Sequence, residues 1–147
     1  MTKFIPKKIP YQDFKFIYDR VPRLCFDLVF NNQDGILMSL RSIEPGKGLW
    51  HFPGGTLLKG ETIHGAMRRV ALEETGLEIG DCKLLGPMEF YKPENPFYHV
   101  VSFAYQVNSW SGQLRGSEQG EKIRFFREIP ETMIEEQKNL IHEHQLL

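Results

Sequence analysis

The sequence has little of what marks secreted, membrane-spanning or nucleic-acid-binding proteins. Only two cysteines occur among its 147 residues, Cys25 and Cys82, and both lie in apolar stretches, which favours buried thiols of a reducing compartment over a disulfide. The net charge is −1, with 18 Lys and Arg against 19 Asp and Glu, which argues against a general nucleic-acid-binding surface. We find no signal peptide and no apolar run long enough to cross a bilayer. We therefore expect a cytoplasmic protein without nucleic-acid or membrane partners.

The chain also lacks internal repeats, low-complexity segments and linkers. A length of 147 residues accommodates one domain with a substantial core, and two only with difficulty. Its 41% apolar and 25% charged content is ordinary for a globular protein. We therefore expect a single domain over residues 1–147, in which residues 1–20 form an N-terminal extension.

The hydrophobic pattern predicts strands on both sides of one central helix. Strands are expected at residues 24–30, 36–40, 84–91, 98–107 and 122–126, with a short extended segment at 50–53. Apolar residues three and four apart predict the central helix over residues 62–75, which Gly76 ends in the left-handed region. Shorter helices are expected at residues 11–19 and 130–140. This order favours an α/β (α+β) fold with a mixed sheet between helices.

Residues 55–77, GTLLKGETIHGAMRRVALEETGL, combine a glycine-containing loop with a helix that carries carboxylates. Because glycine lacks a Cβ, Gly54 and its neighbour would let the backbone approach a phosphate or a metal closely. Glu73 and Glu74 offer the oxygen ligands that Mg²⁺ prefers. Arg69, four residues before Glu73, can hold that carboxylate in place. Taken alone, such a run is also common on solvated helices, and a Gly-Gly pair is usually only a turn.

The spacing of this segment resembles the Nudix box, G-x5-E-x7-R-E-U-x-E-E-x-G-U, in which U is apolar. The matching positions are Gly55, Glu61, Arg69, Glu73, Glu74, Gly76 and Leu77, with Ala71 as a weak match. One position departs, because Val70 stands where the family usually carries Glu. The resemblance covers roughly residues 22–128. It implies a Nudix-type α/β/α sandwich with a mixed sheet and a hydrolase of nucleoside diphosphates linked to another group.

The same resemblance implies a divalent cofactor, Mg²⁺ or Mn²⁺. The carbonyl of Gly54 is the expected backbone ligand, Glu74 the primary carboxylate and Glu73 its neighbour. Glu61, at the loop-to-helix junction, is expected to anchor the loop. Val70 replaces a third carboxylate, which lowers the expected capacity for several metal ions. A homodimer is common in the family, and residues 1–20 are a candidate contact within it.

The runs PRLCFDLVF, LMSLR and PGKGLWHFPGG resemble the GDP-mannose mannosyl hydrolase branch, which also lacks the Glu after the Arg of the box. Its members cleave at the sugar carbon and release GDP and free sugar. This implies that Asp27 contacts the substrate near the departing group, that Arg41 neutralises charge on the diphosphate, and that Gln119 binds the metal. A guanidinium suits the second task because it stays charged and presents a fork of donors. In simpler interpretations Asp27 is an edge-strand charge, and Arg41 and Gln119 are ordinary loop residues.

The general base is open, because the branch uses a His directly after its metal-binding Gln and this chain has Gly120 there. Glu118 and Glu121 in the same loop, or His99 on a neighbouring strand, are candidates. Tyr98 is an aromatic candidate for contact with the substrate. The predicted catalytic set is therefore Asp27, Arg41, Arg69, Glu73, His99, Glu118 and Glu121.

Three functional hypotheses follow from the sequence. The first is a magnesium-dependent hydrolase of a nucleotide sugar, GDP-mannose-like, that releases a nucleoside diphosphate and the sugar. The second keeps the metal site but attacks phosphorus, giving a nucleoside monophosphate and a sugar phosphate; Gly120 favours it and Val70 counts against it. The third is a nucleotide-binding module that has lost its catalytic base.

Overall fold

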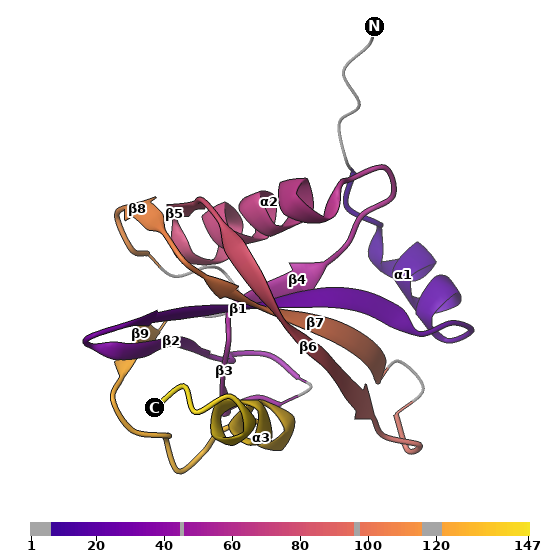
Figure 1. Ribbon diagram of the computed structural model, residues 1–147. Helices are drawn as coiled ribbons and strands as arrows, with labels where there is room; N and C mark the ends of the chain where they lie inside the picture. The colour runs from indigo at the N-terminus through magenta and orange to yellow at the C-terminus, as the bar shows by residue number, and fades with distance from the viewer. Residues whose placement is uncertain (1–6, 45, 96–97, 116–121) are drawn as a thin grey trace, which may run out of the picture.

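A computed structural model describes residues 7–44, 46–95, 98–115 and 122–147. Helices and strands follow one another along the chain in an order that places α2 near the middle and α3 at the end (Figure 1). The elements are α1 (Tyr11–Tyr18), β1 (Arg23–Asn32), β2 (Gly35–Leu40), β3 (Trp50–His51), β4 (Gly54–Thr56), α2 (Ile63–Thr75), β5 (Leu77–Ile79), β6 (Cys82–Tyr91), β7 (His99–Val107), β8 (Trp110–Gly112), β9 (Ile123–Phe126) and α3 (Glu135–Glu143).

Strand β1 is the centre of a seven-stranded mixed sheet with the order β3-β2-β1-β7-β6. It runs parallel to β7 from Arg23 to Phe30. On its other edge it pairs antiparallel with β4, which places Asp27 opposite Gly54, and then with the start of β2. Strand β9 pairs with β2, and β5 and β8 form a separate two-stranded sheet. The predicted mixed sheet is confirmed.

Helices α2 and α3 cover opposite faces of this sheet (Figure 1). Alternate residues of β1 divide between the two layers, since successive side chains of a strand point to opposite faces. Phe26 and Leu28 belong to the core beneath α2, whereas Cys25 and Val29 belong to the core beneath α3. The predicted α/β/α sandwich is therefore confirmed, and the alternation leaves Asp27 on the α3 side of β1.

Helix α2 begins after Thr62 and ends at Gly76, two residue types that favour these positions. Thr62 precedes the helix, and its Oγ1 accepts a hydrogen bond from the Gly65 N–H at 3.0 Å, which satisfies a donor of the first turn. Gly76 ends the helix with φ of 75°, and its N–H donates to the Leu72 carbonyl. A Cβ at Gly76 would lie 2.7 Å from the Gln113 carbonyl oxygen. The predicted central helix and its end are confirmed, which fixes the last turn that carries the paired glutamates.

The last helix and three short strands differ from the sequence prediction. Helix α3 begins at Glu135, five residues after the predicted start at residue 130. The preceding backbone instead bonds to β3: the Trp50 N–H donates to Thr132 O at 2.9 Å, and the Ile134 N–H donates to Trp50 O at 3.2 Å. Strands β4, β5 and β8 were not predicted, because three residues are too few to establish a hydrophobic period.

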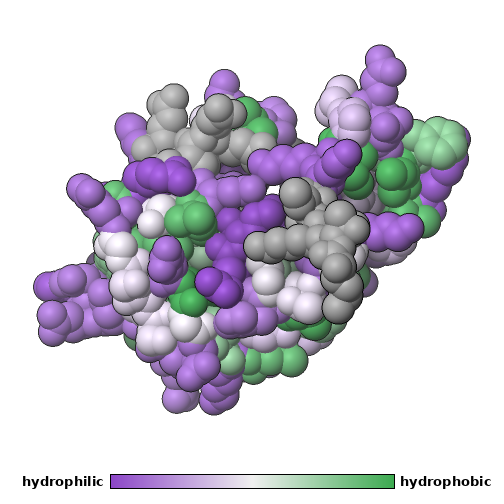
Figure 2. Space-filling view, turned by 90° about the horizontal axis from the view of Figure 1, so that it is seen from above, coloured by the Kyte–Doolittle hydropathy of each residue, from purple (hydrophilic) through white to green (hydrophobic). Residues whose placement is uncertain are grey.

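Helix α1 protrudes from the sandwich and has no buried residue. Hydrophobic side chains gather around it at the right of Figure 2, and the exposed ones include Phe16 and Ile17. Both cysteines are free thiols; Cys25 is buried as expected, whereas Cys82 at the start of β6 is only partly buried. None of the helices in the described residues has the length and apolar character needed to span a membrane.

Candidate active site

One cavity of about 770 Å³ brings together residues from distant parts of the chain. Its walls come from α1, the first half of β1, the strands β3 and β4, the last turns of α2, and residues of β7 and α3. The sequence-predicted residues that line it are Asp27, Arg41, Gly54, Arg69, Glu73, Glu74 and Tyr98. Residues of the Nudix-like box therefore share one cavity with Asp27 of β1 and Arg41, which follows β2.

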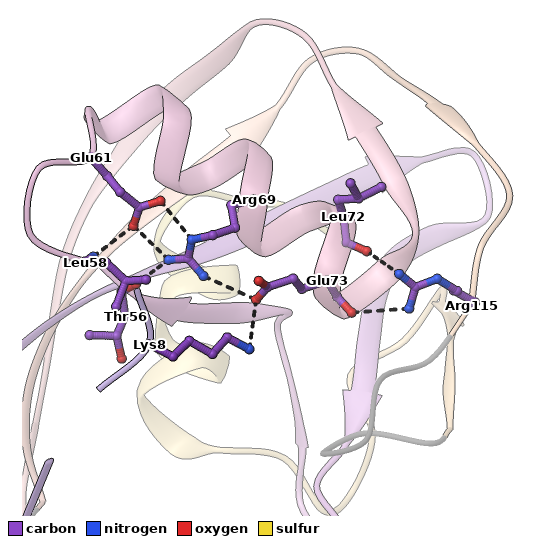
Figure 3. A network of polar contacts seen from close by, with 8 residues as sticks. All are labelled: Lys8, Thr56, Leu58, Glu61, Arg69, Leu72, Glu73 and Arg115. Atoms are coloured by element: carbon purple, nitrogen blue, oxygen red, sulfur yellow. Dashed lines mark hydrogen bonds and ion pairs between the residues drawn. The ribbon is translucent and has the colours of Figure 1, made fainter. Parts of the chain in front are cut away.

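Arg69 ties the glycine-containing loop to α2 (Figure 3). Its Nε donates to Glu61 Oε2 at 2.8 Å and its Nη2 to Glu61 Oε1 at 2.9 Å, and the same Nη2 donates to the Thr56 carbonyl at 2.8 Å. Glu61 Oε1 also accepts from the Leu58 N–H at 2.9 Å. The hydrogen bonds from Arg69 lower the pKa of Glu61. Since both of its oxygens are engaged, Glu61 serves here to hold the loop.

Glu73 is the second carboxylate that Arg69 contacts. Arg69 Nη1 donates to Glu73 Oε2 at 3.2 Å, and the Lys8 ammonium lies 3.4 Å from the same oxygen (Figure 3). The Glu73 side chain remains 37% exposed. Unlike Glu61, the Glu73 carboxylate thus lies at the edge of the cavity, where it contacts Arg69 and Lys8 and is accessible to a ligand.

Gly54 and Gly55, predicted to lie in a loop, belong to strand β4, which approaches β1 and α2 too closely to leave room for a side chain at either position. A Cβ at Gly54 would lie 2.5 Å from the Phe26 carbonyl oxygen and 2.7 Å from Asp27 Oδ1. A Cβ at Gly55 would lie 2.9 Å from Val70 Cγ2. The valine that replaces the glutamate of the box is 1% exposed. Val70 therefore packs β4 against α2 and supplies no oxygen to the site.

The donor set of the cavity fits a divalent cation that a substrate helps to hold. Glu73 and Glu74 provide two carboxylates on the cavity wall, beside the backbone of Gly54. No three His, Cys, Asp or Glu side chains within the described ranges are grouped to hold a metal alone. Magnesium is usually bound by one or two carboxylates together with substrate phosphates. Gln119, the other predicted ligand, lies outside the described residues.

Asp27 is a buried carboxyl group within the cavity, 8% exposed. Ser102 Oγ donates to its Oδ2, and Gln137 Nε2 donates to its Oδ1 at 3.2 Å. The Gln137 amide oxygen in turn accepts from the Phe52 N–H at 2.8 Å. Burial raises the pKa of Asp27 to about 6, against the opposing effect of the Ser102 hydrogen bond. Asp27 is thus held by donors from β7 and α3, and its pKa lies above its ordinary value of 3.8.

Arg41 and His51 face the same cavity. Burial lowers the pKa of Arg41, and the positive charge of Arg23 lowers it further, while Tyr98 and Glu74 act in the opposite direction. Burial and then the Arg41 charge lower the pKa of His51 to about 4. His51 is therefore a neutral imidazole at physiological pH.

Neutral His51 forms a 2.7 Å hydrogen bond between its Nδ1 and the Phe52 carbonyl oxygen. Because a carbonyl only accepts, Nδ1 carries the proton and Nε2 is an acceptor.

Sequence reasoning missed several residues of the cavity: Arg23, His51, Ser102 and Gln137. Only His51 carried a sequence signal, as a histidine three residues before Gly54. Ser102 and Gln137 look like ordinary polar residues of a strand and a helix until the fold places them against Asp27. His99 is not brought to the cavity, since its Nε2 lies 3.9 Å from Glu89 Oε2 and its ring packs against Tyr91. Glu118 and Glu121 lie outside the described residues.

Comparisons with known proteins agree with this geometry. The NUDIX domain family matches residues 21–145. The chain is 32% identical over 124 residues to the low-salt glycan biosynthesis protein Agl8 of Haloferax volcanii, covering 81% of this chain and 80% of that protein. It is 29% identical over 120 residues to an ADP-ribose pyrophosphatase of Methanocaldococcus jannaschii, covering 80% of this chain and 70% of that protein.

A solved structure supports the fold in particular. The MutT NUDIX hydrolase from Burkholderia pseudomallei superimposes with a TM-score of 0.76 at 23% sequence identity, covering 84% of this chain and 98% of that one. The sandwich, the loop held by Arg69 and Glu61, and the two glutamates at the cavity all agree with the family match over residues 21–145. The chain belongs to the Nudix hydrolase family.

Proposed function

We propose that this Nudix hydrolase acts on a GDP-mannose-like nucleotide sugar and releases the nucleoside diphosphate and free sugar. The observation that carries the proposal is that Asp27 and Arg41 face the same cavity as Glu73 and Glu74. In this proposal Arg41, Glu73 and Glu74 bind the diphosphate and its cation, and the Asp27 carboxylate acts on the sugar. The 32% identity to a glycan biosynthesis protein also supports a sugar-linked substrate.

The diphosphate would be held at the end of the cavity formed by α2 and the glycine-containing loop. A divalent cation bound by Glu73, Glu74 and the Gly54 carbonyl would neutralise charge on the phosphate oxygens. Arg41 contributes a fixed positive charge and a fork of N–H donors that matches phosphate geometry. Charge that develops on a departing diphosphate is therefore balanced from the protein side by Arg41.

Asp27 would act on the sugar. Cleavage at the sugar carbon passes through a state in which positive charge develops on the ring. Ser102 and Gln137 hold the Asp27 carboxylate in one position, and the group is ionised above its pKa of about 6. A fixed negative charge beside the sugar stabilises that state. The base that activates water stays a prediction between Glu118 and Glu121, because His99 does not line the cavity.

One relative and one residue favour a second function, hydrolysis by attack at phosphorus. The 29% identity to an ADP-ribose pyrophosphatase supports attack at phosphorus, and Gly120 removes the base that the mannosyl hydrolase branch uses. In this alternative the same metal site and Arg41 bind the diphosphate, but water attacks phosphorus. The products then are a nucleoside monophosphate and a sugar phosphate.

Product analysis separates the candidates. Purified protein is incubated with GDP-mannose, GDP-glucose, ADP-ribose and UDP-glucose in Mg²⁺ and in Mn²⁺, and the products are identified by chromatography and phosphorus NMR. The Glu74→Gln variant, purified in parallel, controls for contaminating hydrolases. GDP with free sugar is the expected result. GMP with sugar phosphate would establish the second function, and binding of nucleotide without turnover would establish a nucleotide-binding module.

A further inference from the structure

Arg23, the first residue of β1, lines the cavity although neither the Nudix box nor the branch resemblance assigns it a role. Its Nη1 donates to Thr56 Oγ1 at 3.0 Å. Its Nε is buried and has no hydrogen-bond partner. Buried donors are almost always paired in folded proteins, so an unpaired one calls for an explanation. In a residue that lines a ligand cavity, a ligand that supplies the missing acceptor is such an explanation.

Two contacts hold the Arg23 guanidinium in place before any ligand binds. The Thr56 hydroxyl fixes one of its terminal nitrogens, and its Cζ lies 5.4 Å from the centre of the Phe14 ring of α1. A cation over an aromatic face at this distance is attracted by the ring. The guanidinium is therefore preorganised, which reduces the entropy lost when it binds a partner.

The charges around the cavity indicate that this partner is an anion. Arg23 has no ion pair within 4.0 Å to any carboxylate in the part of the chain that the structure describes. Its positive charge contributes to lowering the pKa of Arg41, so the two guanidinium groups raise the potential of the same space. An anion placed between them relieves that repulsion and accepts from both forks of donors.

Spacing along β1 puts this anion within reach of the rest of the site. Arg23 lies four residues before Asp27 on the same face of the strand, and both side chains line the cavity. Their Cα atoms are separated by about 13 Å at the usual rise of a strand, a distance that a long arginine side chain reduces considerably. Burial raises the pKa of Asp27, and the charges of Arg23 and Arg41 both act to lower it, so both guanidinium groups act on the part of the cavity that Asp27 and Glu74 line.

We propose that Arg23 is a second phosphate-binding residue, which together with Arg41 clamps the diphosphate of the substrate. The proposal rests on the proposed function for the identity of that substrate. The Nε–H and a terminal N–H of Arg23 would bind non-bridging phosphate oxygens. Because the contact is to phosphate, it serves diphosphate ligands of any nucleobase.

The test measures binding without turnover. Inorganic pyrophosphate, GDP and guanosine, none of which is a substrate of the proposed reaction, are titrated into wild-type protein, Arg23→Gln and Arg23→Lys by calorimetry in the presence of Mg²⁺. Arg20→Gln is the matched control, because exposed Arg20 binds the Phe16 carbonyl and does not line the cavity. Thermal unfolding of each variant without ligand shows whether its fold is intact.

Arg23→Gln is expected to weaken pyrophosphate and GDP binding by roughly 10- to 100-fold, the range for loss of a charge-assisted hydrogen bond. Guanosine binding and the Tm of the free protein should change little, Arg23→Lys should retain part of the affinity, and Arg20→Gln all of it. Unchanged pyrophosphate affinity in Arg23→Gln, or an equal loss of guanosine affinity, would overturn the proposal. If wild-type protein hydrolyses GDP-mannose while Arg23→Gln binds normally, only the role of Arg23 fails. If pyrophosphate binding depends on Arg23 but no nucleotide sugar is cleaved, only the proposed function fails.

Discussion

Replacing Asp27 with Asn removes a buried charge from the cavity and nearly preserves the shape of the side chain. Burial raises the pKa of Asp27 from its ordinary value of 3.8 to about 6, which corresponds to about 3 kcal/mol at 1.36 kcal/mol per pKa unit. Between these two pH values the folded state holds the Asp27 proton more tightly than the unfolded chain does. The contribution of Asp27 to the free energy of unfolding is therefore present below pH 3.8 and lost as the pH rises through about 6.

Asp27→Asn is expected to raise the free energy of unfolding by about 1–3 kcal/mol at pH 7.5 and to change it little at pH 4. An amide can accept from Gln137 and donate to the Ser102 hydroxyl, so both hydrogen bonds of the wild type can be kept. Urea denaturation at the two pH values measures the difference. Asp81→Asn, at an exposed position, is the control for removing a carboxylate from the surface.

The same substitution separates stability from function. If Asp27 stabilises positive charge on the sugar, the more stable Asp27→Asn protein should lose at least about 100-fold in turnover, comparable to other losses of electrostatic stabilisation. Wild-type kcat/KM should fall as the pH drops below about 6, because the carboxylate is then protonated. A destabilised variant at pH 7.5, or equal stabilisation at both pH values, would refute the reasoning from a buried charge.

Other substitutions and metal removal test the remaining parts of the site. Glu74→Gln should lower turnover by about 100-fold with little loss of stability, whereas Glu61→Gln should lower the free energy of unfolding by about 1–3 kcal/mol because it breaks the bidentate pair with Arg69; kinetics and urea denaturation distinguish them. Gly54→Ala should destabilise by about 1–3 kcal/mol, since its Cβ would lie 2.5 Å from the Phe26 carbonyl oxygen, seen as a lower Tm. EDTA should abolish hydrolysis, and added Mg²⁺ or Mn²⁺ should restore it.

The sequence predicted the parts of this protein that are encoded locally. The box spans 23 contiguous residues, 55–77, so its helix, its end at Gly76 and its glutamates follow from spacing alone. The long strands follow from mainly apolar runs such as that of β1, whose residues 25–30 are all buried and are apolar except for Asp27. The resemblance to one branch selected Asp27 and Arg41, and both face the cavity.

Features that depend on distant packing were not predictable in this way. The donors that hold Asp27 come from Ser102 and Gln137, 75 and 110 residues further along the chain, and nothing in their local sequence distinguishes them. Helix α3 starts late because the backbone of residues 132–134 bonds to Trp50, a contact that only the folded chain provides. Arg23 was not selected from the sequence, because its place in the cavity and its unpaired Nε appear only in the folded chain.

Hydrolysis of GDP-mannose in ¹⁸O-labelled water tests the proposed function most directly. Water that attacks the sugar carbon leaves its oxygen on the sugar, whereas water that attacks phosphorus leaves it on a phosphate. Mass spectrometry of the sugar and the isotope shift in the phosphorus NMR spectrum of the nucleotide locate the label. We predict ¹⁸O in free mannose and none in the released GDP. Label in the phosphate of GMP or of mannose phosphate would contradict the proposal and assign the site to attack at phosphorus.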